Sequence, residues 1–243
     1  MYDGDARGDI QMTADLVDTT EMYLKAILEL EEELIVPLRA RIAERLHHSG
    51  PTVSQTIARM ERDGLVVVSG DRHLEFTPLG RERATSVMRK HRLAERLLSD
   101  VIKLDWAYVH EEACRWEHVM SEQVEEKLFE LLGKPEDSPY GNPIPGLESF
   151  GGHKAREFTE GVINMVSAME QYNPDTKVVI GRLSERIQVD PELLGQFEEA
   201  GLKPGVNISL EQVGEYISVR VPGVEGALEL PPEVAVHVFV AID

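Results

Sequence analysis

The chain has 243 residues and a mass of 27.3 kDa, enough for one or two domains. Its 44 acidic residues outnumber 25 basic ones, and the net charge of −19 argues against binding nucleic acid or anionic membranes through bulk charge. One cysteine excludes an intrachain disulfide and suits a reducing cytoplasm, where we expect the protein to act. No apolar run reaches the ~18 residues of a membrane span, so no membrane partner is expected. Residues 1–14 are predicted to be a disordered extension.

The first part of the chain predicts a winged helix-turn-helix. Apolar residues at helical spacing indicate one helix over residues 15–33, a second from Pro37 and a third from Pro51. Two short apolar runs follow, and Gly70-Asp71-Arg72 between them is typical of a hairpin turn. Helices followed by a β-hairpin are the order of elements in a winged helix.

The rest of the chain divides into a helical part and a β part. Helices are expected over residues 79–103 and 107–132, and residues 133–146 hold four prolines, which indicates a turn-rich connector. Residues 151–173 fit either a helix or the start of a strand. Beyond them, the alternating segments VVIGRL, NISLEQ, YISVRV, ALEL and VHVFVAI predict a small barrel of five strands, with a short helix near residues 190–200.

Residues 39–62 carry five arginines against two glutamates, which reverses the charge of the chain locally. Clustered cations on one face are enough for salt-dependent contact with DNA phosphates. The start of the third helix in this motif meets base edges, and Gln55 there can bond adenine through two hydrogen bonds. DNA binding is therefore predicted. The alternative is a protein-interaction module whose arginines are only solvated.

Metal-ligand side chains recur at helical spacing in the two central helices. His110, Cys114 and His118 follow one another at intervals of four, with Glu117 beside them, and His91 and Glu95 are also four apart. Imidazole, carboxylate and thiolate groups together suit a transition metal better than calcium or magnesium. Each residue alone is more often a surface contact or a small buried side chain. Their concentration favours a metal site.

Long blocks of the sequence resemble the diphtheria-toxin-repressor family of iron-dependent regulators. They are DLVDTTEMYL, PLRARIAERL, SGPTVSQT, ARMERDGLVVV, MRKHRLAERLL, EACRWEHVMS and GNPIPGL. The likeness is near-continuous over residues 15–150 and patchier afterwards. It implies a mainly α fold with a winged-helix domain over residues 15–85 and a helical metal-binding and dimerisation domain over 86–152. A linker over 153–174 and an SH3-like β-barrel over 175–243 would follow.

The resemblance also implies two metal sites and a set of DNA contacts. The regulatory site would use Met22, Cys114, Glu117 and His118. The ancillary site would use His91, Glu95 and His110, completed by Glu185 and Gln188 from the C-terminal domain. The DNA-contacting residues would be Thr19, Arg39, Arg41, Ser49, Pro51, Thr52, Ser54, Gln55, Arg59, Arg62 and Arg72.

The function implied is that of a non-enzymatic repressor of iron uptake and storage genes, activated by Fe²⁺. Co²⁺, Ni²⁺, Zn²⁺ or Mn²⁺ would substitute in vitro. The partners would be a second copy of the chain and a pseudo-palindromic operator in double-stranded DNA, with two dimers on each operator. A manganese-responsive regulator of the same fold is the nearest alternative, although the soft sulfur of Cys114 favours iron. A metal-independent winged-helix repressor and a metalloenzyme are the others. Against the enzyme, no HExxH, GxSxG or P-loop motif is present.

Overall fold

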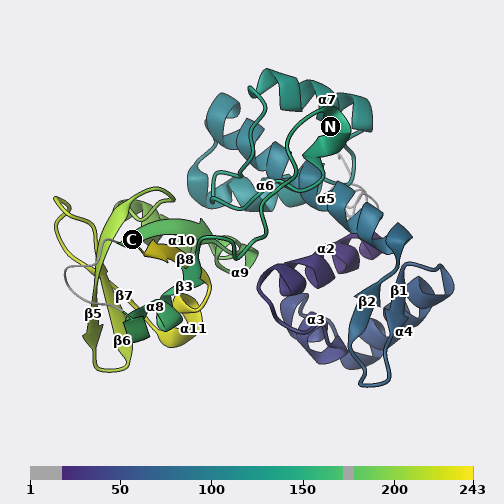
Figure 1. Ribbon diagram of the computed structural model, residues 1–243, viewed down its shortest axis with the longest axis horizontal. Helices are drawn as coiled ribbons and strands as arrows, with labels where there is room; N and C mark the ends of the chain where they lie inside the picture. The colour runs from purple at the N-terminus through teal and green to yellow at the C-terminus, as the bar shows by residue number, and fades with distance from the viewer. Residues whose placement is uncertain (1–17, 172–177, 243) are drawn as a thin grey trace, which may run out of the picture.

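The computed structural model describes residues 18–171 and 178–242. The extension predicted over residues 1–14 lies outside this part of the chain. Figure 1 shows three bodies: a winged helix with its hairpin, a helical body, and a body built on a β-sheet. Among the described residues, no helix is both long and apolar enough to cross a membrane. The mainly α fold with a small β domain, expected from the sequence, is confirmed.

The winged helix is formed by α2 (Thr19–Glu32), α3 (Arg39–Arg45), α4 (Gly50–Arg62), β1 (Val66–Val68) and β2 (Leu74–Phe76). The side chain of Asp18 caps α2, and that of Ser49 caps α4. The second helix begins at Arg39, two residues after the predicted start, because Leu38 pairs with His73 of the hairpin as an isolated β-bridge. The apolar core of this body includes Tyr23, Ile57 and Met60, and Ala84 and Met88 from the helix that follows the hairpin complete it.

The helical body begins with α5 (Pro78–Leu97), which continues directly into the π-helical turn η1 (Leu98–Ile102). The predicted domain boundary after residue 85 falls inside this continuous helix. Next come η2 (Trp106–Tyr108), α6 (Val109–Trp116), α7 (Glu122–Leu131) and η3 (Leu147–Phe150). The single helix predicted over residues 107–132 is therefore wrong. The chain breaks between Trp116 and Glu122, where Ser121 caps α7 with its side chain.

The C-terminal body is a six-stranded antiparallel sheet in the order β3-β8-β4-β5-β6-β7. All five predicted strands form, as β4 (Val178–Leu183), β5 (Asn207–Val213), β6 (Tyr216–Arg220), β7 (Leu228–Leu230) and β8 (Val238–Ile242). β3 (Ile163–Asn164) and α8 (Met165–Gln171) lie in the stretch predicted as linker, which thus holds both a strand and a helix. The remaining helices are α9 (Glu185–Gln188), α10 (Pro191–Glu199) and α11 (Pro232–Ala235). In the described residues β3 and β7 are edge strands, so the sheet is open and not the closed barrel expected.

One apolar core joins the helical body to the C-terminal body. Ala94 and Val109 from the helices belong to the same buried cluster as Ile180 and Phe197 from the C-terminal body. The backbone N–H of Leu183 in β4 also donates to the Tyr140 carbonyl at 2.9 Å. Ile187 of α9 and Ala94 of α5 belong to this shared core, which places α9 beside the helix that carries His91 and Glu95.

Candidate metal centre and DNA-binding surface

Two helices bring four predicted ligands together in the helical body. α5 supplies His91 and Glu95 one turn apart, and their Nε2 and Oε1 atoms lie 2.8 Å from each other. α6 supplies His110 and Cys114, whose Nε2 and Sγ atoms lie 3.6 Å apart. The two histidine rings meet edge to face, with His91 Nε2 lying 3.1 Å from His110 Nδ1. Ligand atoms of His91, His110 and Cys114 all lie within 4.8 Å of one another, a spacing that can hold one metal ion.

The break after α6 brings two more predicted ligands to the same place. Glu117 Oε2 lies 2.6 Å from His91 Nδ1, and Glu117 Oε1 lies 3.4 Å from His118 Nε2. His118 Nδ1 lies 2.7 Å from Glu21 Oε2 in the first turn of α2. The predicted regulatory and ancillary sites therefore adjoin, and the contact between His91 and Glu117 joins them. Met22 is half-buried and packs against the winged-helix core.

Sequence reasoning missed a residue of this cluster, Lys25. Its Nζ atom donates to Glu117 Oε2 at 2.9 Å and to Cys114 Sγ at 3.4 Å, and lies 3.0 Å from His91 Nδ1. The sequence signals only its burial, because Lys25 stands between the apolar pairs Tyr23-Leu24 and Ala26-Ile27. A lysine there needs an anionic partner, since an unpaired buried charge is costly.

The surroundings set the protonation states of the predicted ligands. Burial acts to raise the pKa of the Cys114 thiol, but His110, Lys25 and His91 outweigh it and hold that pKa well below its usual value. Burial likewise opposes ionisation of Glu117, yet Lys25 and His91 lower its pKa to about 2. For His110, burial lowers the pKa, and the charge and hydrogen bond of Cys114 raise it to about 9. The cluster thus presents a thiolate and a carboxylate beside protonated imidazole.

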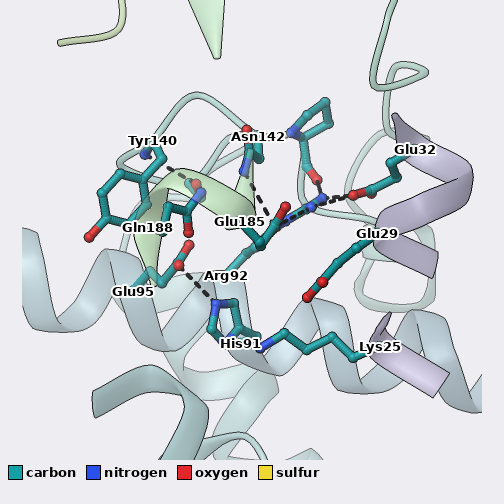
Figure 2. Close-up of polar contacts among 12 residues, drawn as sticks. Lys25, Glu29, Glu32, His91, Arg92, Glu95, Tyr140, Asn142, Glu185 and Gln188 are labelled. Carbon is teal, nitrogen blue, oxygen red and sulfur yellow. Dashed lines mark hydrogen bonds and ion pairs between the residues drawn. The ribbon is translucent and has the colours of Figure 1, made fainter. Parts of the chain in front are cut away.

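Glu185, expected as an ancillary ligand, contacts Arg92 in this structure. Arg92 Nη2 donates to Glu185 Oε1 at 2.6 Å and to Glu32 Oε2 at 2.5 Å, and Arg92 Nη1 donates to the Pro143 carbonyl at 2.5 Å. Figure 2 shows this fully buried guanidinium between carboxylates from α2 and α9. One arginine therefore joins the winged helix, the helical body and the C-terminal body.

Gln188 lies on α9, one turn after Glu185, and its amide nitrogen donates to the Leu183 carbonyl at 2.7 Å. Its Oε1 atom has no hydrogen-bond partner among the described residues, and neither has Oε2 of Glu95. Figure 2 shows the Glu95 carboxylate pointing toward the Gln188 amide. Buried oxygens without partners are unfavourable, and a cation between them would satisfy both. The residues therefore fit the group that the ancillary site is expected to hold.

The predicted DNA contacts form an accessible surface on the winged helix. All of these side chains are exposed except Arg39, which is half-buried. Ser49 caps α4, Pro51 and Gln55 lie in its first turns, and Arg72 lies at the hairpin tip with a left-handed φ of 71°. Arg59 donates to the Thr20 hydroxyl at 3.3 Å, which connects α4 to the start of α2. Nothing in the structure tests individual DNA contacts, and they stay predictions.

A winged helix attached to a body that concentrates thiolate, imidazole and carboxylate groups defines a metal-responsive DNA-binding protein. Residues 15–74 match the family "Iron dependent repressor, N-terminal DNA binding domain". Residues 77–146 match "Iron dependent repressor, metal binding and dimerisation domain". The chain belongs to the iron-dependent repressor family, as the sequence blocks indicated. Because the members of this family are transcriptional regulators, the metalloenzyme alternative is set aside.

Individual relatives agree with this assignment. The iron-dependent repressor IdeR of Mycobacterium tuberculosis is 52% identical over 222 residues, which is 91% of this chain and 96% of the relative. The diphtheria toxin repressor of Corynebacterium diphtheriae is 55% identical over 207 residues, 84% of this chain and 89% of the relative. Among solved structures, T. acidophilum IdeR has a TM-score of 0.71 at 30% identity and covers 93% of this chain and 99% of its own.

Proposed function

We propose that this protein is an Fe²⁺-activated repressor of iron uptake and storage genes, and that it binds a pseudo-palindromic operator as two homodimers. Its place of action is then the cytoplasm. We retain the division into a winged helix over residues 15–85, a helical domain over 86–152, a linker and an SH3-like domain over 175–243. The observation that carries the proposal is the cluster of His91, His110, Cys114 and Glu117 directly beside α2.

A bound divalent ion would supply concentrated positive charge to this group of thiolate, imidazole and carboxylate ligands. Cys114, Glu117 and His118, with Met22 from α2, would hold it at the regulatory site. His91, Glu95, His110, Glu185 and Gln188 would hold it at the ancillary site. The side chains that must lose protons first are the histidines, since the environment already favours the thiolate of Cys114.

The chain's own residues connect this centre to the DNA-binding surface. Glu21 and Lys25 on α2 contact the ligands His118 and Glu117, and Thr20 on the same helix contacts Arg59 of α4. A change in how the ligands hold α2 therefore acts directly on the helix that precedes the recognition surface. Because binding free energies are reciprocal, operator DNA must tighten metal binding by the factor by which metal tightens DNA binding.

A direct test is anaerobic titration of a labelled candidate operator with Fe²⁺, at several salt concentrations. We expect occupancy to require metal, and affinity to fall with salt. Cys114→Ala and Glu117→Gln should each abolish the metal-activated increase in operator binding, so that the variants bind weakly with or without Fe²⁺. Glu130→Gln removes an exposed carboxylate paired with Lys134 and serves as the matched control. Operator binding that is unchanged by metal and by chelator would refute the proposal.

Manganese response is the second candidate. A solved structure titled "Manganese-dependent transcriptional repressor complex with manganese" has a TM-score of 0.77 at 25% identity and covers 92% of this chain. The thiolate of Cys114 favours iron, because Mn²⁺ prefers harder oxygen ligands. Parallel titrations of the operator complex with Fe²⁺ and Mn²⁺ separate the two candidates. Equal operator affinity at equal free metal concentration would favour a manganese-responsive repressor.

A further inference from the structure

Lys25 occupies a position in the cluster that a cation would be expected to fill. Its side chain is 7% exposed, and its ammonium contacts Cys114, Glu117 and His91, which come from α6, from the break after α6 and from α5. All three are predicted ligands, and they belong to both metal sites. A single side chain of α2 thus reaches the junction of the two sites.

The charges around Lys25 keep it an ammonium. Burial acts against the charged form, but Cys114, Glu117 and Glu29 outweigh it and raise the pKa of Lys25 far above its usual value. The ammonium therefore neutralises the same anionic atoms that a divalent ion would neutralise.

Met22, a predicted ligand, lies close to Lys25 on α2. Met22 precedes Lys25 by three positions, so both lie on adjacent parts of one helix face. In this structure Lys25 reaches the ligands, whereas the Met22 side chain packs against the winged-helix core. α2 can thus offer the cluster either an ammonium from Lys25 or a thioether from Met22, and the two choices require different placements of the helix.

We propose that the Lys25 ammonium is an internal counter-cation that closes the metal-free centre, and that a metal ion must displace it to bring Met22 to the ligands. The proposal rests on the metal-dependent function above and adds the residue that sets the metal threshold. Lys25 acts as a positioning residue, because it holds α2 in its metal-free placement. Two cations competing for the same anionic atoms weaken each other's binding by a shared factor.

The experiment compares Lys25→Leu, which removes the charge and adds no ligand, with Lys25→Arg, which retains the charge. Exposed Lys154 provides the matched control, Lys154→Leu. Metal affinity is measured anaerobically with Co²⁺ by calorimetry and by the visible absorption of the bound ion. Thermal unfolding and hydrogen exchange over residues 19–32 are measured on the metal-free proteins.

We expect Lys25→Leu to bind Co²⁺ about tenfold more tightly, within the range usual for coupled sites. The metal-free variant should melt at a lower temperature and exchange the amides of α2 faster, because Glu117 and Cys114 lose their counter-charge. Lys25→Arg should bind Co²⁺ no more tightly than wild type, and Lys154→Leu should match wild type throughout. If Lys25→Leu does not fold, Lys25→Gln is compared by the same measurements.

The outcomes separate this proposal from the proposed function. Wild-type protein that binds Co²⁺, with a Lys25→Leu variant of equal or weaker affinity, overturns the role of Lys25 and leaves the repressor intact. Failure of wild type and every variant to bind Co²⁺ overturns the metal-dependent function itself. Tighter Co²⁺ binding without any change in α2 exchange would contradict the positioning of α2 by Lys25.

Discussion

Glu33 Oε2 lies 2.6 Å from His237 Nδ1, a contact between residues 204 positions apart in the sequence. Glu33 is the residue after α2, and His237 precedes β8 in the C-terminal body. Arg92 adds a second connection, because it donates to Glu32 and Glu185 together. The C-terminal body therefore holds the end of α2 whose beginning contacts the metal ligands.

His237→Ala should loosen the C-terminal body from the winged helix without unfolding either. The lost contact costs about 1.5–3 kcal/mol, the range for a hydrogen bond to a charged group. Glu33 keeps Arg45 Nη2 at 2.8 Å. We expect faster hydrogen exchange at the end of α2. His153→Ala, a histidine with an 89% exposed side chain, is the control. Unchanged exchange in His237→Ala would mean that apolar packing alone fixes this interface.

Arg92→Met should strongly destabilise the protein. It leaves the carboxylates of Glu32 and Glu185 buried without their shared cation, and breaking such a buried pair costs about 3–5 kcal/mol. Urea unfolding measures the loss. Arg115→Met, which removes an exposed pair with Glu111, should change the free energy of unfolding little. A tolerated Arg92→Met would show that apolar packing replaces this ion cluster without loss.

Metal affinity should rise with pH up to about 9, the folded-state pKa of His110, whose ordinary value is about 6.5, because the metal must displace the proton of this imidazole. A raised pKa stabilises the metal-free fold below 6.5, and this contribution disappears as the pH passes through about 9. His118 titrates in the same direction: burial lowers its pKa, but Glu21 and Glu117 raise it above the usual value. Calorimetry in buffers of different ionisation enthalpy counts the protons released. Affinity that is flat over this range would contradict protonated histidines in the metal-free centre.

Val101→Glu should weaken the homodimer. Val101 and Ile102 in η1 are 55% and 50% exposed in the single chain, an unusual position for two adjacent large apolar side chains. The helical body matches a dimerisation domain, and we expect this apolar pair to lie in the subunit interface. Sedimentation at micromolar concentration should then show a larger monomer fraction. Val189→Glu, at a 58% exposed valine of the C-terminal body, is the matched control. An undiminished dimer would place the interface elsewhere.

Helical and strand periodicity was enough to predict most of the architecture. The winged helix and all five expected strands followed from apolar spacing, because each buries one face against a core. The break between α6 and α7 was not predictable, since the apolar stripe continues across Trp116 and Met120. At this end of α6, Glu117 and His118 meet partners from α5 and α2, contacts that local sequence pattern does not predict.

Part of the candidate site could also be predicted from the sequence, and part could not. The spacing of His91, Glu95, His110 and Cys114 placed four ligands on two helix faces, and the structure brings those faces together. Contacts between residues distant in sequence were not accessible to this reasoning. Neither the reach of Lys25 to Cys114 nor the pairing of Glu185 with Arg92 follows from local pattern, because each depends on how separate bodies pack.

Because α5 is uninterrupted, it couples the orientation of the winged helix to the position of the expected dimer interface. The helix starts directly after the wing at Pro78, carries His91 and Glu95, and runs into the turn that bears Val101. Each residue of an α-helix advances it by about 1.5 Å and turns it by about 100°. One residue inserted near Glu82 would therefore rotate each winged helix about the axis of α5, relative to the ligands on α5 and α6 and to the expected dimer contact. Operators whose half-sites have a different helical phase would then be selected, while the ligands on α5 and α6 stay in place and Met22 on α2 moves with the winged helix.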